Sequence, residues 1–293
     1  MNGISTRSAA ASMGVPALAL LAMLAFAGNS LLCRLALQRT DIDPASFTAL
    51  RLLSGTAMLL MLVALRGHCT LAARPRGRAR WLAPLALFGY MAGFSFAYVE
   101  LPAATGALLL FGAVQATMIG VSLWRGERLR GRRLAGFVLA LGGLVGFLLP
   151  GLSAPPPGAA MLMLGAGVAW AVYSLRGRDV ADPLGATARN FMFAALPGAL
   201  LALVFFTRLT IDLPGMLCAL ASGAIASGLG YAVWYAVVPK VGGTVAATMQ
   251  LSVPVLTALG GPGLLGEPLS LRLALASAAI LGGIALVVMR GAA

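Results

Sequence analysis

Uncharged polar side chains are scarce inside the apolar stretches of this sequence, and those that occur there are mainly amides and hydroxyls. A polar group in the hydrocarbon of a bilayer is costly, so such residues commonly line a pathway or a binding site. A hydrogen bond between two neighbouring helices is the alternative, and it stays open. The residues that we predict to line a ligand site are Asn29, Gln115, Gln250 and Ser252.

Pro254 follows Gln250 in the same apolar stretch, with three residues between them. Proline has no backbone N–H, so inside a helix it leaves the carbonyl four residues earlier without its usual partner. We expect Pro254 near the middle of a helix over residues 243–265, which would leave the Gln250 carbonyl as a free acceptor beside the Gln250 amide. An ammonium or a hydroxyl group of a ligand could bind there.

Aromatic residues recur at helical spacing in three apolar stretches, which places them on one face of each helix. A buried hydroxyl or indole N–H needs a partner, so the deeper aromatic residues are candidates for the lining of a cavity. Packing or anchoring at the lipid headgroups is the alternative, favoured for Tyr98 and Tyr235 because both lie near helix ends. The predicted cavity residues are Tyr90, Phe94, Trp170, Tyr173 and Tyr231.

Arg51 is a basic residue clearly inside an apolar stretch, about one and a half turns from its end. At that depth its long side chain can reach the headgroups, which would make its role interfacial or structural. The other interpretation is contact with the carboxylate of a bound ligand. Both interpretations stay open, and Arg51 completes the predicted site.

Acidic residues and metal ligands are absent from the interior of the apolar stretches. All eight Asp and Glu residues fall in connections or at helix ends, so no carboxylate is expected at mid-depth to carry a proton. His68, Cys33, Cys69 and Cys218 are scattered, without metal-ligand spacing. We predict no metal, no cofactor and no catalytic residue, so the protein is not expected to be an enzyme.

Two other classes of membrane protein are disfavoured. An intramembrane enzyme would need a nucleophile with a base beside it, or a cluster of metal ligands. A passive channel would need rings of polar or charged residues, which this chain cannot supply.

Glu127 and Glu267 sit in equivalent Gly-Glu turns, where we expect each to cap the helix that follows. We therefore exclude both glutamates from the predicted ligand site.

The composition requires an all-α integral membrane protein. Hydrophobic residues make up 60% of the 293 residues and charged residues 10%, and the mean hydropathy is +0.95. Apolar stretches of about 18 to 23 residues suffice to cross a bilayer as helices. We predict ten transmembrane helices, near residues 15–36, 46–66, 81–99, 102–124, 132–150, 158–176, 187–207, 214–238, 243–265 and 270–290.

The net charge of +13 indicates orientation and not a nucleic-acid partner. The basic residues concentrate in alternate connections, such as residues 66–80 and 125–133, which is the positive-inside pattern. This pattern predicts that both termini are cytoplasmic. Contacts with anionic lipids are expected at the inner connections, and the protein is expected to be a monomer or a weak homo-oligomer.

An internal repeat divides the chain into residues 1–150 and 151–293. Residues 107–143 align with residues 247–283 at a constant offset of 140. Five helices in each half are an odd number, which forces the two halves into opposite orientations. Inverted repeats of this kind build alternating-access transporters with a site near the midplane. Matching residues include Ala107/Ala247, Thr117/Thr257, Gly126-Glu127/Gly266-Glu267 and Leu141-Gly142-Gly143/Leu281-Gly282-Gly283.

Further matched motifs mark the same halves. Asp43-Pro44 corresponds to Asp182-Pro183, each before the second helix of its half, and Arg51 lies early in the helix after Asp43-Pro44. Together with the Gly-Glu turns, these motifs resemble the drug/metabolite transporter superfamily, specifically its paired-repeat exporters, and YddG-type amino-acid exporters within it. The mid-helix proline expected around Gln115 is absent, whereas Pro254 is present in the other half.

The resemblance implies a bacterial inner-membrane carrier that exports small neutral metabolites, above all aromatic or other neutral amino acids. Transport would proceed by alternating access through a central cavity between the repeats, without a buried proton-carrying carboxylate. Exporters of other amphipathic metabolites or of drugs are the alternative within the superfamily. The implied partners are a small-molecule substrate and the lipid bilayer.

Overall fold

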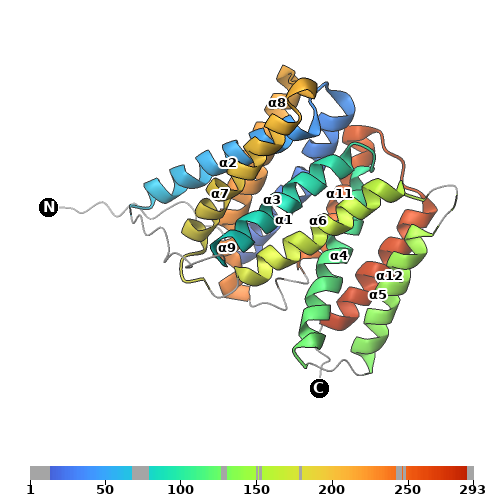
Figure 1. Ribbon diagram of the computed structural model, residues 1–293. Helices are drawn as coiled ribbons and strands as arrows, with labels where there is room; N and C mark the ends of the chain where they lie inside the picture. The colour runs from blue at the N-terminus through green and yellow to red at the C-terminus, as the bar shows by residue number, and fades with distance from the viewer. Residues whose placement is uncertain are drawn as a thin grey trace.

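Every regular element among the described residues of the computed structural model is a helix (Figure 1). The model describes residues 14–67, 79–126, 131–149, 151, 154–177, 180–241, 246 and 249–288. The first half contains α1 (Val15–Arg39), α2 (Pro44–Leu65), α3 (Ala79–Tyr98), α4 (Ala103–Trp124) and α5 (Arg132–Leu148). The second half contains α6 (Pro157–Arg176), α7 (Pro183–Val204), the short η2 (Phe206–Arg208), α8 (Leu213–Leu220), η3 (Ala221–Leu229), α9 (Gly230–Val241), α11 (Ser252–Leu265) and α12 (Leu271–Val288).

Seven candidate membrane spans among the described residues confirm that this is a multi-pass membrane protein. Each of the ten predicted stretches overlaps at least one helix, and α8, η3 and α9 form one continuous run. Two further apolar helices, Ser252–Leu265 and Leu271–Val287, are shorter than a span. The helices long and apolar enough to cross a membrane are Val15–Arg39, Pro44–Leu65, Arg80–Tyr98, Ala103–Trp124, Pro157–Arg176, Pro183–Val204 and Leu213–Val241.

The Asp-Pro pairs begin α2 and α7 by the same local chemistry. Asp43 accepts hydrogen bonds from the backbone N–H groups of Ala45 and Ser46, both at 2.9 Å. Asp182 accepts one from the N–H of Gly185 at 3.2 Å. The proline after each aspartate takes the first helical position, where no N–H is needed. The repeated motif is therefore a helix start that fixes where both helices enter the bundle.

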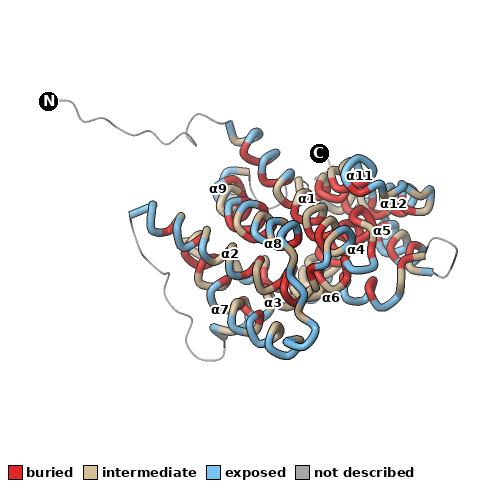
Figure 2. The backbone as a smooth tube through the Cα atoms, turned by 90° about the horizontal axis from the view of Figure 1, so that it is seen from above, coloured by how far each residue is buried: buried red, intermediate tan, exposed pale blue. Residues whose placement is uncertain are grey.

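Helices from the two halves pack against each other in pairs. α5 lies along α12 at one edge of the molecule, α2 along α7, and α3 along α6 (Figure 1). α1 packs against α9 and α11, and α4 against α6. The buried positions face the middle of the bundle, while exposed positions cover its outside (Figure 2). Large apolar side chains stay exposed on that outer surface, among them Leu65, Leu203 and Leu271, as expected where a helix meets lipid.

The backbone between α8 and α9 widens into a π-helix over η3. This segment, Ala221–Leu229, is made of small residues apart from Ile225 and Leu229, which lets α2 approach closely. A Cβ atom added at Gly223 would overlap the backbone carbonyl of Arg51 on α2. π-helical turns frequently occur at functional sites, and η3 brings two serines toward the interior.

The continuous helix predicted over residues 243–265 is not what the structure shows. Met249 and Gln250 are helical, Leu251 forms a turn, and α11 begins at Ser252. Pro254 therefore lies in the first turn of α11 and not near the middle of a helix. A proline is tolerated there because the first backbone N–H groups of a helix have no internal partner.

The close contact between α5 and α12 gives a test of the fold. A Cβ added at Gly283 would lie 2.6 Å from the backbone nitrogen of Ala140, whereas a Cβ at the neighbouring Gly282 would meet nothing within 4 Å. Overpacking costs roughly 1–3 kcal/mol. We expect Gly283→Val to lower the thermal unfolding midpoint of the detergent-solubilised protein.

Gly282→Val is the matched control, because it introduces the same helix-propensity cost one residue away without the clash. Equal unfolding midpoints for the two variants would contradict the observed packing of α5 on α12.

Candidate functional site

The centre of the bundle holds a fully buried arginine. The Arg51 side chain on α2 is 0% exposed. Its Nε and Nη2 atoms donate to the Ser227 hydroxyl of η3 at 3.3 and 3.2 Å, and Nη2 also donates to the Tyr90 hydroxyl of α3 at 3.1 Å. The guanidinium carbon lies 5.0 Å from the ring centroid of Phe94 and 5.4 Å from that of Tyr90. Arg51 thus joins α2, α3 and η3 at one point.

A chain of polar side chains continues from Arg51 to α1. Asn29 donates through Nδ2 to the Tyr90 hydroxyl at 3.5 Å, and its Oδ1 accepts from the Ser222 hydroxyl at 2.6 Å. Ser222 and Ser227 both belong to η3, so the chain begins and ends on the π-helical segment. Buried polar groups are tolerated when they bond to one another in this way. The result is a polar core crossing four helical elements.

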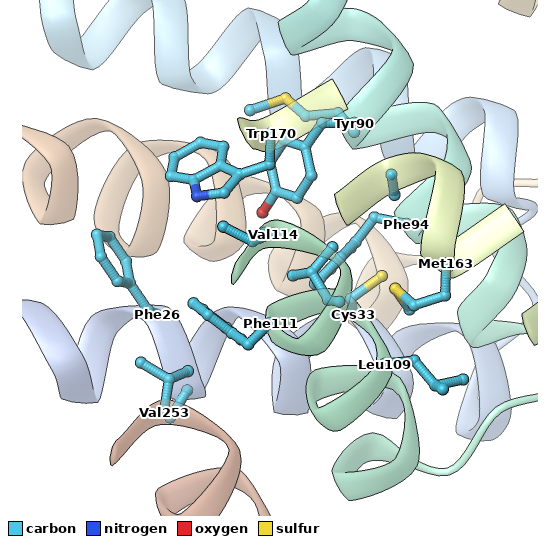
Figure 3. Packing of buried hydrophobic residues seen from close by; sticks show 14 of the residues in the cluster. Phe26, Cys33, Tyr90, Phe94, Leu109, Phe111, Val114, Met163, Trp170 and Val253 are labelled. Atoms are coloured by element: carbon cyan, nitrogen blue, oxygen red, sulfur yellow. The ribbon is translucent and has the colours of Figure 1, made fainter. Parts of the chain in front are cut away.

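Aromatic rings pack beside this polar core. Trp170 on α6 lies 4.9 Å from the Tyr90 ring, 5.2 Å from the Tyr231 ring and 5.5 Å from the Tyr173 ring, measured between centroids. Phe26 on α1 meets Tyr231 edge-on at 5.7 Å. Figure 3 shows Trp170 and Tyr90 next to each other, with Phe94 nearby. α1, α3, α6 and α9 each contribute at least one ring to the cluster.

A small cavity lies inside this cluster. Its volume is about 20 Å³, which is room for about one water molecule. In this conformation the rings therefore fill most of the space that a ligand would take. The lining residues are Phe26, Asn29, Ser30, Tyr90, Phe94, Leu110, Phe111, Trp170, Ala226 and Tyr231.

A larger cavity adjoins the central one and extends toward one face of the bundle. We call it the vestibule; it has a volume of about 200 Å³ and is lined by residues that include Trp170, Tyr231, Trp234, Tyr235 and Gln250. Trp170 and Tyr231 line both cavities, so their side chains form the partition between them.

The vestibule shares part of its wall with another cavity of about 160 Å³. Tyr235 and Val180 line both. Three arginines, Arg80, Arg176 and Arg189, line this cavity, which we call the arginine-lined cavity. No acidic side chain is among the described residues that line it.

An ion pair lies where α1 approaches the turn between α11 and α12, at a different end of the helices from the vestibule. Arg34 on α1 donates through Nε to Glu267 at 2.7 Å, and through Nη1 to the carbonyls of Tyr98 and Val99 at 2.9 Å each. The second carboxylate oxygen of Glu267 accepts the backbone N–H of Ala103, which opens α4, at 2.7 Å. These bonds tie α1, α3, α4 and the α11–α12 turn together; we call them the Arg34–Glu267 network.

A family comparison identifies the class of protein to which this site belongs. The model of the EamA-like transporter family matches the chain twice, over residues 14–149 and 157–289. The chain belongs to the EamA-like transporter family. The resemblance to the drug/metabolite transporter superfamily is thereby confirmed, with two EamA repeats across the chain.

Two individual proteins are similar to this EamA-like transporter. An uncharacterised protein of Pseudomonas aeruginosa is 58% identical over 272 residues, which span 92% of this chain and 93% of the relative. A protein of known crystal structure is 23% identical and superposes with a TM-score of 0.63, covering 93% of this chain and 96% of the other. The structural likeness shows a shared fold. The family assignment makes this chain a membrane transporter.

The transporter brings six of the ten predicted site residues into one cluster. Asn29, Tyr90, Phe94, Trp170 and Tyr231 line the central cavity, and Arg51 lies against two of its rings. Arg51 is fully buried, so the interpretation that it reaches the lipid headgroups is wrong. The apolar length between Arg51 and the helix end suggested snorkelling, but the Ser227 and Tyr90 hydroxyls hold the guanidinium inside.

The other four predicted residues lie farther from the centre. Tyr173 lines the arginine-lined cavity, and Gln250 lines the vestibule. Gln115 is buried one turn from Phe111 on α4, and its Nε2 has no hydrogen-bond partner among the described residues. The Ser252 hydroxyl donates to the Met249 carbonyl at 2.7 Å, across the break before α11.

The structure decides one prediction for a residue near a helix end and corrects another. Of packing and headgroup anchoring, the two roles open for Tyr98, the structure shows packing, because Tyr98 is fully buried and donates to the Ala103 carbonyl at 3.1 Å. Glu267 caps α4 and not the following helix α12, where the Ser270 hydroxyl accepts the N–H of Leu273. The distant partner could not be found in sequence because Glu267 and Ala103 are 164 residues apart. Glu127 lies outside the described residues.

Sequence reasoning missed several residues that the transporter places at important points. Ser222 and Ser227 hold Asn29 and Arg51, and Arg34 pairs with Glu267. The two serines are polar residues inside a predicted span, a signal that would have included them in the site. Arg34 lies before the predicted end of the first span, at residue 36, and that position indicated a buried charge in need of a partner.

The Arg34–Glu267 network gives a testable prediction about access to the interior. Cys33, next to Arg34, is a free cysteine with 0% exposure. Glu267→Gln removes the charge that receives Arg34, at a cost of roughly 1.5 kcal/mol or more, equivalent to about tenfold in the open population. We expect Glu267→Gln to accelerate maleimide labelling of Cys33 by about that factor, in a variant with Cys69 and Cys218 replaced by serine.

The control is Glu100→Gln, which changes an exposed glutamate at the same end of the molecule. Equal labelling rates for the Glu267 and Glu100 variants would show that the Arg34–Glu267 network does not restrict access to Cys33.

Proposed function

We propose that this transporter is a bacterial inner-membrane carrier that exports small neutral metabolites, with amino acids as the expected substrates. The carrying observation is the aromatic cavity around Asn29, Tyr90 and Arg51. It is formed by both halves of the chain and adjoins the vestibule on one side. The rings suit an apolar or aromatic side group, and the polar core suits an amphipathic head.

The proposed mechanism is alternating access between two inverted five-helix halves, residues 1–150 and 151–293, with ten membrane-spanning helices in all. The contacts between helices support a two-fold relation, because exchanging the halves converts one observed pair into another. The α3–α6 pair corresponds to α9–α1, and the α4–α6 pair corresponds to α11–α1. The pairs α2–α7 and α5–α12 each correspond to themselves. Inverted repeats commonly place one substrate site between them.

The proposed orientation puts both termini in the cytoplasm, following the positive-inside pattern. The vestibule and the cavity lined by Arg80, Arg176 and Arg189 then face the cytoplasm. The Arg34–Glu267 network then faces outward, beside a cavity of about 370 Å³ that Arg34, Glu100 and Glu267 help to line. Anionic lipids would contact the basic inner connections. We propose a monomer or a weak homo-oligomer as the transporting unit.

Uptake into proteoliposomes tests the carrier function. Trp170 separates the central cavity from the vestibule and contacts three other rings. Trp170→Ala removes that stacking surface. Truncating a buried aromatic residue to alanine typically costs roughly 3–5 kcal/mol of folding free energy, which indicates how many contacts are lost. We expect saturable uptake and counterflow of labelled neutral amino acids by the wild type, and uptake reduced at least about tenfold in the variant.

Trp124→Ala is the matched control, because Trp124 is 90% exposed at the end of α4. Uptake that rises linearly with substrate concentration would point to a channel. Saturable uptake that Trp170→Ala leaves unchanged would remove the cavity from the pathway. Saturable transport of other amphipathic metabolites in place of amino acids would favour the alternative substrates within the superfamily.

Energy coupling can be tested in the same vesicles. The acidic residues among the described positions, Asp41, Asp43, Glu100, Asp182, Asp212 and Glu267, all lie outside the helices. No described carboxylate is therefore placed at mid-depth to carry a proton across. We expect the same initial uptake rate with and without an imposed pH gradient. Accumulation driven by a pH gradient alone would contradict this export mechanism.

A further inference from the structure

Among the described residues, no opposite charge pairs with Arg51. The ion pairs among the described residues join Arg34 to Glu267 and Arg66 to Asp182, and neither includes Arg51. Its hydrogen-bond partners are the uncharged hydroxyls of Ser227 and Tyr90. Keeping an unpaired charge away from water is expensive, and in membrane proteins such residues mark functional positions. Arg51 therefore calls for an anion that the described residues do not provide.

Buried polar atoms without a hydrogen-bond partner lie around the same point, and one of them, Arg51 Nη1, can only donate. Arg51 Nη1 and the Tyr231 hydroxyl are buried and have no hydrogen-bond partner among the described residues. The Tyr90 oxygen accepts from both Arg51 and Asn29, so its own proton must point elsewhere. A ligand that supplies acceptors would satisfy these donors, whereas a ligand that supplies further donors would not.

The geometry of the guanidinium suits a carboxylate. Nη2 of Arg51 is held by Ser227 and Tyr90, while Nη1 is vacant, so the edge formed by the two terminal nitrogens is only half occupied. A carboxylate binds along that edge with two parallel N–H···O bonds, one to each nitrogen. One oxygen would pair Nη1, and the other would take the place of the Tyr90 hydroxyl on Nη2.

We propose that the central site recognises its substrate through a carboxylate bound to Arg51, and that it needs no ammonium group. This inference rests on the proposed function and requires each substrate to carry one carboxylate beside an apolar or aromatic group, as neutral amino acids do, without requiring the ammonium group that makes those substrates neutral overall. The rings of Phe26, Trp170 and Tyr231 receive that group. No acidic side chain is among the described residues that line the central cavity, so an ammonium finds no ionic partner there.

The approach to the site favours the same class of ligand. Arg80 and Arg176 line the cavity that shares a wall with the vestibule. A cleft lined by one sign of charge raises the local concentration of oppositely charged ligands. Anions are thus concentrated on the side from which the vestibule leads to Trp170 and Tyr231.

The aromatic partition must open for the ligand to bind. The central cavity holds about 20 Å³ and the vestibule about 200 Å³. Movement of Trp170 and Tyr231 would join the two volumes, and movement of Tyr90 would uncover the Arg51 edge. The carboxylate replaces the Tyr90 hydroxyl on Arg51, which couples binding of the anion to release of Tyr90.

A matched set of three ligands tests the inference on the intact wild-type protein. Phenylalanine, 3-phenylpropionate and phenethylamine have the same phenyl ring. Phenylalanine carries a carboxylate and an ammonium group, 3-phenylpropionate carries only the carboxylate, and phenethylamine carries only the ammonium group. A ligand that binds only the folded state raises the unfolding midpoint of the protein. We expect phenylalanine and 3-phenylpropionate to stabilise the detergent-solubilised protein and phenethylamine not to. Stabilisation by phenethylamine equal to that by 3-phenylpropionate would overturn the inference.

Substitutions of Arg51 provide the second test of the inference. Arg51→Gln should weaken 3-phenylpropionate binding by about ten- to a hundredfold, the usual loss for a charge-assisted hydrogen bond. Arg272→Gln is the matched control, because Arg272 donates to backbone carbonyls at the end of α5 and lines neither the central cavity nor the vestibule. If Arg51→Gln does not fold, Arg51→Lys keeps the charge and loses the paired nitrogens, and it should weaken 3-phenylpropionate binding by about tenfold. Unchanged affinity in the folded Arg51 variant would overturn the inference.

The binding assay separates this inference from the proposed function. Stabilisation by 3-phenylpropionate that depends on Arg51, without amino-acid uptake into proteoliposomes, would contradict amino-acid export and support the carboxylate site. Amino-acid uptake with an unchanged half-saturation concentration in Arg51→Gln would support the carrier function and overturn the carboxylate site.

Discussion

A chain that crosses a bilayer must satisfy its buried polar groups from within, and here that requirement converges on the guanidinium of Arg51. The Ser227 and Tyr90 hydroxyls hold it, so α3 and the π-helical η3 must both lie against α2. The glycine at position 223 permits that approach, because any side chain there would overlap the Arg51 carbonyl. Asn29 then ties α1 to the same point through Tyr90 and Ser222. The positions of four helical elements therefore depend on solvating one buried charge.

The aromatic rings complete what the hydroxyls begin. Phe94 and Tyr90 present their rings to the guanidinium, and Trp170 packs on Tyr90 from α6. Ring faces attract a cation without donating or accepting a conventional hydrogen bond. They thus surround Arg51 without neutralising it, unlike the carboxylate that pairs with Arg34. A site assembled in this way stays compact when empty and keeps its charge available.

The sequence predicted the helices and the aromatic lining because both depend on local pattern. The apolar stretches determine the spans, the Asp-Pro pairs begin α2 and α7 through bonds within one turn, and helical spacing puts Tyr90 and Phe94 on one face. Distant partners were not predictable from such patterns. Glu267 bonds to Arg34 across 233 positions in the chain, and the break at Leu251 moves Pro254 to a helix start. The burial of Arg51 likewise depends on Ser227, 176 residues away.

The two buried arginines illustrate how pairing separates structural from binding roles. Arg34 donates hydrogen bonds to Glu267 and to the carbonyls that end α3, so its charge is balanced and its geometry is fixed. A balanced pair of this kind holds helices together and has little left to offer a ligand. Arg51 has only neutral partners and a vacant nitrogen. An unbalanced buried charge persists at a cost in folding free energy, and an anionic ligand recovers that cost on binding. Among the described residues, Arg34 therefore has the contacts of a structural residue, whereas Arg51 keeps one unpaired nitrogen and only uncharged partners.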